Sequence, residues 1–526
     1  MFSCRAPATA CTFLLACCLS LTGCTVGPDY EPPRVAMPER FHSVPGEAGS
    51  RLRPVAQSAT TRPAGEAEVA ELATWWRAFK DPTLDGLIDR AVAGNLDLRR
   101  AEARLREARA LLAAERSGFF PELDARGSVT RSRQSQSGPL PPGQSSESTL
   151  WRAGFDARWE LDVFGGTRRA MEAARAELGA AEEDRSAVLT SLLAEVASNY
   201  IALRGTQQQL RIAFDNIESQ RQTLAFNRAR FEAGLVSELD VSRSAAQLAS
   251  FEATVPTLRV AEASAIHRLA VLLGVAPGTL REELGEVPDG QPRTAGSVPM
   301  ALPEVPVGLP SDLLRRRPDV RRAERRLAAA TARIGVATAD LFPRFSLTGS
   351  LGTQGNEAPR LVQARSIFWS VGPAVSWNLF DGGRVRANIE AQNARQAQAL
   401  ADYERTVLLS LEEVENAVTS YARNVERRAA LARAVEASRR SVELAAGRFA
   451  GGEGLGDLLD VLLAQRDLFQ AEEALVRVDT QLSADLVALY KALGGGWSMP
   501  AEPSAAPRPA DPQAPATSAG ERTAAP

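Results

Sequence analysis

Side chains that could perform chemistry are scarce in this 526-residue chain. Its two histidines, His42 and His267, are too few for a histidine-based metal centre or a Ser-His-Asp triad. His267 lies on an apolar helical stretch, where we expect it to pack rather than bind a ligand. The two lysines, Lys80 and Lys491, do not follow a glycine-rich loop, which excludes a Walker-type phosphate site. We therefore expect no enzyme activity, no cofactor and no metal.

The composition is that of a folded, helix-rich protein. Charged residues make up 24% and hydrophobic residues 44% of the chain. The net charge is −3, from 61 basic and 64 acidic residues, so there is no basic excess to neutralise phosphates. We expect no nucleic acid partner. Alanine, leucine, arginine and glutamate dominate, as expected of long helices.

All five cysteines lie in the first 24 residues, together with Arg5 and an apolar run from about residue 10 to 21. A basic start followed by a short apolar run is the layout of a secretory signal. The segment ends Leu21-Thr22-Gly23-Cys24, which resembles a bacterial lipobox. We expect cleavage after residue 23 and acylation of Cys24, for example by palmitate. An ordinary signal peptide with a chance cysteine is the alternative.

The rest of the chain repeats itself at a period of about 220 residues. Six landmarks recur in the same order: Phe120-Pro121 and Phe342-Pro343, Trp159 and Trp377, Tyr200 and Tyr421, Arg230-Phe231 and Arg448-Phe449, Asp240-Val241 and Asp460-Val461, Leu273-Gly274 and Leu493-Gly494. We infer a duplicated unit.

The repeats set the expected domain boundaries. They are a signal peptide (1–23), a lipidated N-terminal segment (24–83), a first repeat (84–274), a linker wrapping the outside (275–310), a second repeat (311–496) and a disordered tail (497–526). Residues 43–70 resemble the tail in composition.

Each repeat contains a very long helical stretch with apolar residues at helical spacing. The stretch from Gly166 to Gly234 would measure roughly 100 Å at 1.5 Å per residue. A helix of that length cannot belong to a compact domain and needs a coiled-coil partner or a helical tube. Pro256 predicts a kink in the helix that follows.

Each repeat also contains two segments in which apolar and polar residues alternate. They predict strands near residues 121–131, 151–162, 343–353 and 367–379, each long enough to span a bilayer when tilted. Tryptophans stand at both ends of the second strand of each pair, as in an interfacial aromatic girdle. A soluble two-hairpin sheet is the alternative.

Four strands in a membrane would leave two edges unpaired, which lipid does not tolerate. The edges must therefore pair with other chains. Two chains would supply eight strands, too narrow for a transport duct, whereas three supply twelve. We expect a homotrimer.

Four motifs in this chain resemble the outer membrane factors of bacteria, the TolC/OprM type, and more closely their NodT-like lipoprotein branch associated with RND efflux. They are Cys24-Thr25-Val26-Gly27-Pro28-Asp29-Tyr30, Trp75-Trp76 with Asp81-Pro82, Pro310-Ser311-Asp312-Leu313-Leu314 with Arg316-Arg317-Pro318-Asp319-Val320, and Trp377-Asn378-Leu379-Phe380-Asp381-Gly382-Gly383. The resemblance covers nearly all of residues 24–496.

The resemblance implies a mainly α fold with a membrane β-barrel portion. A duplicated unit with four strands per chain would complete a 12-stranded trimeric barrel on a long α-helical periplasmic barrel. It also implies an outer membrane location with a lipid anchor, and a passive duct that carries drugs, dyes, detergents or metal ions out of a tripartite pump. The implied partners are a periplasmic adaptor, an inner membrane transporter of the RND type and outer membrane lipid.

The resemblance further implies a pore constriction at the periplasmic tip. Asp460 matches an acidic ring position of the family, and Asp457 lies one helical turn earlier. Asp240 matches a residue that links neighbouring helices in the closed state of relatives, but glycines stand at its usual partner positions. For Asp457 a helix N-cap, and for Asp240 the end of a capping box that starts at Ser237, are the alternatives.

Two other functions stay open on the sequence alone. A duct for protein export by a type I system would share the fold, although the lipobox favours the efflux branch. A lipid-anchored periplasmic coiled-coil scaffold would contain no membrane barrel.

Overall fold

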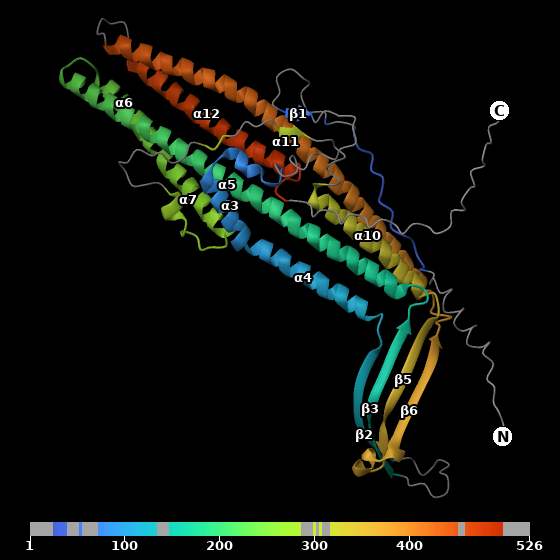
Figure 1. The fold of residues 1–526 in the computed structure, drawn as a ribbon. Coiled ribbons are helices and arrows are strands. Elements are labelled where there is room, and N and C mark those ends of the chain that lie inside the picture. The colour runs from blue at the N-terminus through green and yellow to red at the C-terminus, as the bar shows by residue number, and fades with distance from the viewer. Residues whose placement is uncertain are drawn as a thin grey trace, which may run out of the picture.

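The computed structural model describes residues 25–38, 41, 52–54, 72–133, 147–285, 298–300, 305–307, 316–450 and 458–497. A long bundle of helices carries a four-stranded sheet at one end, and the sheet points away from the bundle (Figure 1). Cys24 and Asp457 lie outside the described residues.

Two helices of 67 residues each run along the bundle: α5 (Gly166–Glu232) and α11 (Arg384–Ala450). Each is roughly 100 Å long, which confirms the long helices expected from the sequence. One stretch of α5 is apolar enough to cross a membrane by length and composition, but half of it is buried inside the protein. That stretch is therefore explained as part of the core.

The remaining helices pack along these two. They are η1 (Trp75–Phe79), α3 (Pro82–Gly94), α4 (Leu96–Ser117), α6 (Glu238–Glu252), α7 (Thr254–Leu272), α8 (Arg281–Leu284), α10 (Pro318–Ala339) and α12 (Leu458–Ala492). The break expected from Pro256 lies between α6 and α7, at Ala253. Proline has no N–H to bond the carbonyl of Glu252, and its ring crowds that carbonyl.

The main core lies at the middle of the bundle, where both repeats contribute. Trp75 stacks on Tyr490, with ring centroids 5.5 Å apart. Tyr200 and Tyr421, which occupy equivalent positions in the two repeats, are both fully buried. Burial raises the pKa of Tyr200 to about 12, and its hydroxyl donates to Asp81 at 2.7 Å.

The sheet is antiparallel, in the order β2–β3–β5–β6. Its strands are β2 (Glu122–Arg133), β3 (Glu147–Leu161), β5 (Arg344–Gly355) and β6 (Ile367–Ser376). The pairing of β3 with β5 joins the two repeats, and short 3-10 turns, η2 (Ala358–Val362) and η3 (Ala364–Ser366), connect β5 to β6. β2 and β6 pair on one side only.

Strand β6 is shorter than the sequence predicts. It ends at Ser376, so Trp377 lies beyond it. There the Trp377 indole N–H donates to the carbonyl of Leu341 at 3.0 Å. Trp159, its counterpart in the first repeat, donates in the same way to the carbonyl of Phe119 at 3.0 Å.

A small parallel pair was not expected. β1 (Leu52–Pro54) pairs with β4 (Val305–Val307). Part of the 43–70 segment, which we expected to resemble the tail, thus forms a strand against the linker. At the other end of the chain the guanidinium of Arg321 lies over the ring of Trp497, 5.3 Å from its centroid. The expected disordered tail therefore begins one residue too early, since residue 497 is packed.

The N-terminal segment at residues 25–38, which we call the strap, is held by a buried arginine at the start of α5. The Arg169 side chain is only 4% exposed and pairs with Asp29 at 2.6 Å and Glu172 at 2.8 Å. It also donates to the carbonyl oxygens of Val26 and Gly27. The strap is therefore fixed at the start of α5.

The strap also contacts the second repeat. Tyr30 donates to Glu324 on α10 at 3.2 Å. Gly27 has a φ of 89° and lies so close to Gly335 of α10 that a Cβ would overlap its backbone. Val35 and Met37 pack against a small cluster built from α10 and α11. The strap thus crosses both repeats.

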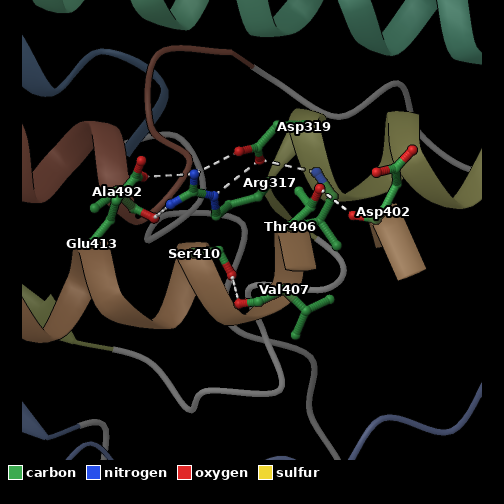
Figure 2. A network of polar contacts seen from close by, with 9 residues as sticks. Arg317, Asp319, Asp402, Thr406, Val407, Ser410, Glu413 and Ala492 are labelled. Atoms are coloured by element: carbon green, nitrogen blue, oxygen red, sulfur yellow. Dashed lines mark hydrogen bonds and ion pairs between the residues drawn. The ribbon is translucent and has the colours of Figure 1, made fainter. Parts of the chain in front are cut away.

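A second buried arginine joins the start of α10 to the end of α12 (Figure 2). Arg317 bonds Asp319 at 2.6 Å and Glu413 at 2.7 Å, and donates to the carbonyl of Ala492 at 3.1 Å. Asn95 has the equivalent place in the first repeat and donates to the carbonyl of Leu272 at 2.8 Å. The Arg317 guanidinium holds the pKa of Asp319 below its usual range, against the opposing effect of burial.

We predict that Arg317→Ala lowers the free energy of unfolding by about 3 kcal/mol, because a buried, multiply bonded charge is removed and its partners are left unpaired. The contribution of Asp319 is complete above the usual carboxyl pKa and is lost as the pH falls through its lowered pKa. Guanidinium titration followed by circular dichroism measures the loss at neutral pH. Arg316→Ala is the control, and an equal loss in both variants would contradict the prediction.

Candidate functional site

The two faces of the sheet differ in chemistry. One face is apolar, and its large side chains are exposed on the single chain: Leu123, Val129, Phe155, Leu161, Leu347, Leu351, Trp369, Val371 and Val375. Trp369 is 74% exposed and Val371 is 70% exposed. A continuous apolar face of this size on bilayer-length strands indicates contact with lipid.

The opposite face is polar and divided between the two hairpins. The β2–β3 hairpin carries the charges, and Arg126 bridges Asp156 at 3.3 Å and Asp124 at 3.7 Å. The β5–β6 hairpin carries mainly small neutral residues, and Ser350 and Ser370 share a hydrogen bond of 2.7 Å. A wall that is apolar outside and polar inside is the pattern of a barrel with an aqueous lumen.

The strands pass into the long helices through two equivalent turns. Asp162 accepts hydrogen bonds from the backbone N–H groups of Thr167 and Arg168 at the start of α5. Asp381 accepts from Gly383 and Val385 at the start of α11. Each carboxylate satisfies N–H groups that the helix itself leaves unpaired. The sheet thus passes into the helices through a hydrogen-bonded turn in both repeats.

The two predicted pore residues that the structure describes are in the first turns of α6 and α12, and both helices begin at the end of the bundle far from the sheet (Figure 1). Asp240 is in the first turn of α6 and completes a capping box with Ser237. Its carboxylate accepts from the Ser237 hydroxyl at 2.7 Å and backbone N–H at 3.0 Å, which lowers its pKa. Asp460 is exposed in the first turn of α12.

Contacts between helices near this tip are partly polar. Asn227 of α5, which is fully buried, donates to Ser244 of α6 at 2.7 Å. Gln465 of α12 donates to Thr223 of α5 at 3.4 Å, and its side-chain oxygen is buried without a partner. The apolar cluster around Phe251 and Phe469 covers only part of this region. Packing at the tip is therefore weaker than at the middle of the bundle.

Metal-ligating side chains do not gather anywhere in the described part of the chain. No group of three or more metal-ligating side chains occurs there. A groove of about 920 Å³ lies between α4, α5, α10 and α11 and is lined by alanines and paired charges. His267, which we expected to pack, is exposed. Its position on the outer side of α7 explains the error.

A long helical bundle that continues into a lipid-facing sheet with a polar inner face defines an outer membrane channel. The chain belongs to the outer membrane efflux protein family, whose model matches residues 87–275 and 309–495. The resemblance inferred from the sequence motifs is therefore confirmed, as is the mainly α fold with a membrane β-barrel portion.

The individual relatives agree with this family. Nodulation protein T of Rhizobium leguminosarum bv. trifolii is 31% identical over 480 residues, which are 91% of this chain and 96% of the relative. The solvent efflux pump outer membrane protein SrpC of Pseudomonas putida is 32% identical over 483 residues, 91% of this chain and 97% of the relative.

The solved structures give the same assignment. The structure of the outer-membrane channel OprN is 40% identical and covers 90% of this chain and 100% of that chain, with a TM-score of 0.79.

Proposed function

We propose that this chain is the exit duct of a tripartite efflux pump and passively carries small toxic compounds from the periplasmic side to the outside. The observation that supports this most is the sheet, which has an apolar outer face, a polar inner face and two helices of 67 residues leading from it. Relatives named for toluene and solvent efflux support small apolar cargo.

The duct is proposed to be a homotrimer. β2 and β6 each have one unpaired edge, and lipid does not tolerate such edges. Three copies close a 12-stranded barrel by pairing β2 of one copy with β6 of the next. Eight strands from two copies would leave little room for cargo.

A periplasmic adaptor and an inner membrane transporter of the RND type are the proposed partners. Exposed apolar residues gather at the helical tip: Phe231, Leu235, Leu239, Leu459 and Leu463. An apolar surface at the end farthest from the sheet supports docking of a periplasmic protein there.

Cys24 is the proposed site of lipid attachment. Thr25, the next residue, contacts Gly165 at the junction of β3 and α5. This junction is at the helix end of the lipid-facing sheet, so acyl chains on Cys24 would begin at the level of the membrane surface.

Mass spectrometry of the purified chain tests the lipid anchor. We expect a mature N-terminus at Cys24 carrying acyl chains. A mature chain that starts elsewhere, or a free thiol at residue 24, would contradict this proposal.

Electron microscopy of the detergent-extracted protein, with threefold symmetry tested rather than imposed, tests whether the chain forms a trimeric duct. We expect a tube well over 100 Å long with a threefold axis, because the long helices alone span roughly 100 Å. A slender monomeric or dimeric rod would contradict the duct and favour a lipid-anchored scaffold.

Asp457, Asp460 and Asp240 are proposed to narrow the periplasmic opening. Asp460 is exposed near the tip, and threefold symmetry would triple each charge. The capping box gives Asp240 a structural role whether or not it faces the pore.

We predict that the double variant Asp457→Ala, Asp460→Ala raises single-channel conductance in planar bilayers, because it removes the acidic ring. Asp215→Ala, an exposed carboxylate in the last third of α5, is the control. Unchanged conductance in the double variant would refute the gate.

A further inference from the structure

One aromatic side chain stands on the polar face of the sheet. Among the strand residues that the structure describes, Phe368 at the start of β6 is the only aromatic residue in register with this face. Its neighbours along the same face of β6 are Ser370, Gly372, Ala374 and Ser376. Phe368 therefore differs from the other residues on this face of β6, which are small and neutral.

The sheet makes room for this ring. Phe368 is opposite Gly352 of β5, which in turn is opposite Gly154 of β3. A Cβ at Gly352 would come within 2.9 Å of the Phe368 ring tip. The two glycines therefore let the ring reach across β5 toward β3.

The ring reaches an arginine on β3. The guanidinium carbon of Arg152 lies over the Phe368 ring, 4.4 Å from its centroid, which is a cation–π contact. Arg152 is exposed, and no acidic side chain in the described residues pairs with it. The nearest carboxylate along its strand is Asp156, four residues or about 13 Å away, and Arg126 already pairs with it.

We infer that Arg152, held in place by Phe368, forms a cationic collar in the outer half of the duct and favours the passage of anionic solutes. This inference rests on the proposed duct, since it needs the polar face to line a lumen. Arg152 is in the first half of β3, and it is the other end of β3 that leads to the helices (Figure 1). Three copies would place three unpaired guanidinium groups at one level.

The positive charge at Arg152 is local and does not reflect a general excess of basic residues on the polar face. Arg126, Arg158 and Arg344 on the same face are accompanied by Glu122, Asp124, Asp156 and Glu160, so deeper levels contain both signs. Arg152 has neutral residues opposite it on both neighbouring strands, Ser128 on β2 and Gln354 on β5. By contrast, Arg126 pairs with Asp156, Arg344 pairs with Asp340, and Arg158 is opposite Glu122.

The charge of the collar can be measured from the rates at which charged reagents modify a cysteine placed opposite Arg152. No cysteine follows Cys24 in the natural chain, so Gln354→Cys provides a single thiol in register with Arg152. Whole cells are treated with two membrane-impermeant methanethiosulfonates, one anionic (sulfonatoethyl) and one cationic (trimethylammonioethyl). The ratio of the two rates cancels any effect on the thiolate fraction, since both reagents use the same thiolate.

We predict that the rate with the anionic reagent divided by the rate with the cationic reagent is roughly tenfold higher in the chain that keeps Arg152 than in the Arg152→Gln variant. The guanidinium, one strand spacing from the thiol, attracts the anionic reagent and repels the cationic one, and the two effects add in the ratio. Arg158→Gln is the matched control. It removes the same charge six residues away, about 20 Å along the strand, which is beyond two Debye lengths at physiological salt. Its ratio should stay unchanged.

The role of Phe368 is tested in the same chain. Phe368→Ala should lower the ratio toward that of Arg152→Gln, because the guanidinium is no longer held over the ring, and Phe368→Tyr should restore it. Equal ratios with and without Arg152, both reagents reacting, would overturn the collar and leave the duct intact. A thiol at residue 354 that neither reagent reaches would contradict the duct itself.

Discussion

The apolar stripe along α5 is the interaction on which the rest of the molecule depends. A helix of roughly 100 Å cannot be covered by one neighbour, so α4, α10, α12, α6 and α7 each cover part of it. The stripe passes through the main core at Leu193, Val196 and Tyr200, all essentially buried. Because helices from both repeats cover the same stripe, neither repeat can bury its core without the other.

The spacing of apolar residues along the chain was sufficient to predict the strands and the long helices, because each of these elements has a periodic pattern of its own. The alternation around Trp159 and Trp369 located the strands, and the helical spacing through Tyr200 and Tyr421 located the long helices. Pro256 marked the break between α6 and α7 because its effect acts on a carbonyl only four residues earlier. Duplication helped, since each pattern could be read twice.

Contacts between distant segments could not be predicted in this way. Nothing in the local pattern pairs Leu52–Pro54 with Val305–Val307, since a parallel pair of three residues has no periodic signal of its own. The same holds for Arg152, which looks like one of several alternating charges until Gly352 and Phe368 are placed beside it. In the candidate site, the sequence located Asp240 and Asp460 at the two turns, but the capping geometry had to come from the structure.

The strap gives the molecule a gradient of stiffness along its length. Near the sheet, the residues from Thr25 to Met37 connect α5, α10 and α11, and an ion pair with the buried Arg169 holds this segment in place. At the opposite end, the helices contact one another partly through amides and hydroxyls, such as Asn227 with Ser244. Among the described residues, no segment like the strap connects the helices there. We therefore expect a bending force on the molecule to deform the tip first and to leave the end next to the sheet, which must stay sealed in lipid, largely unchanged.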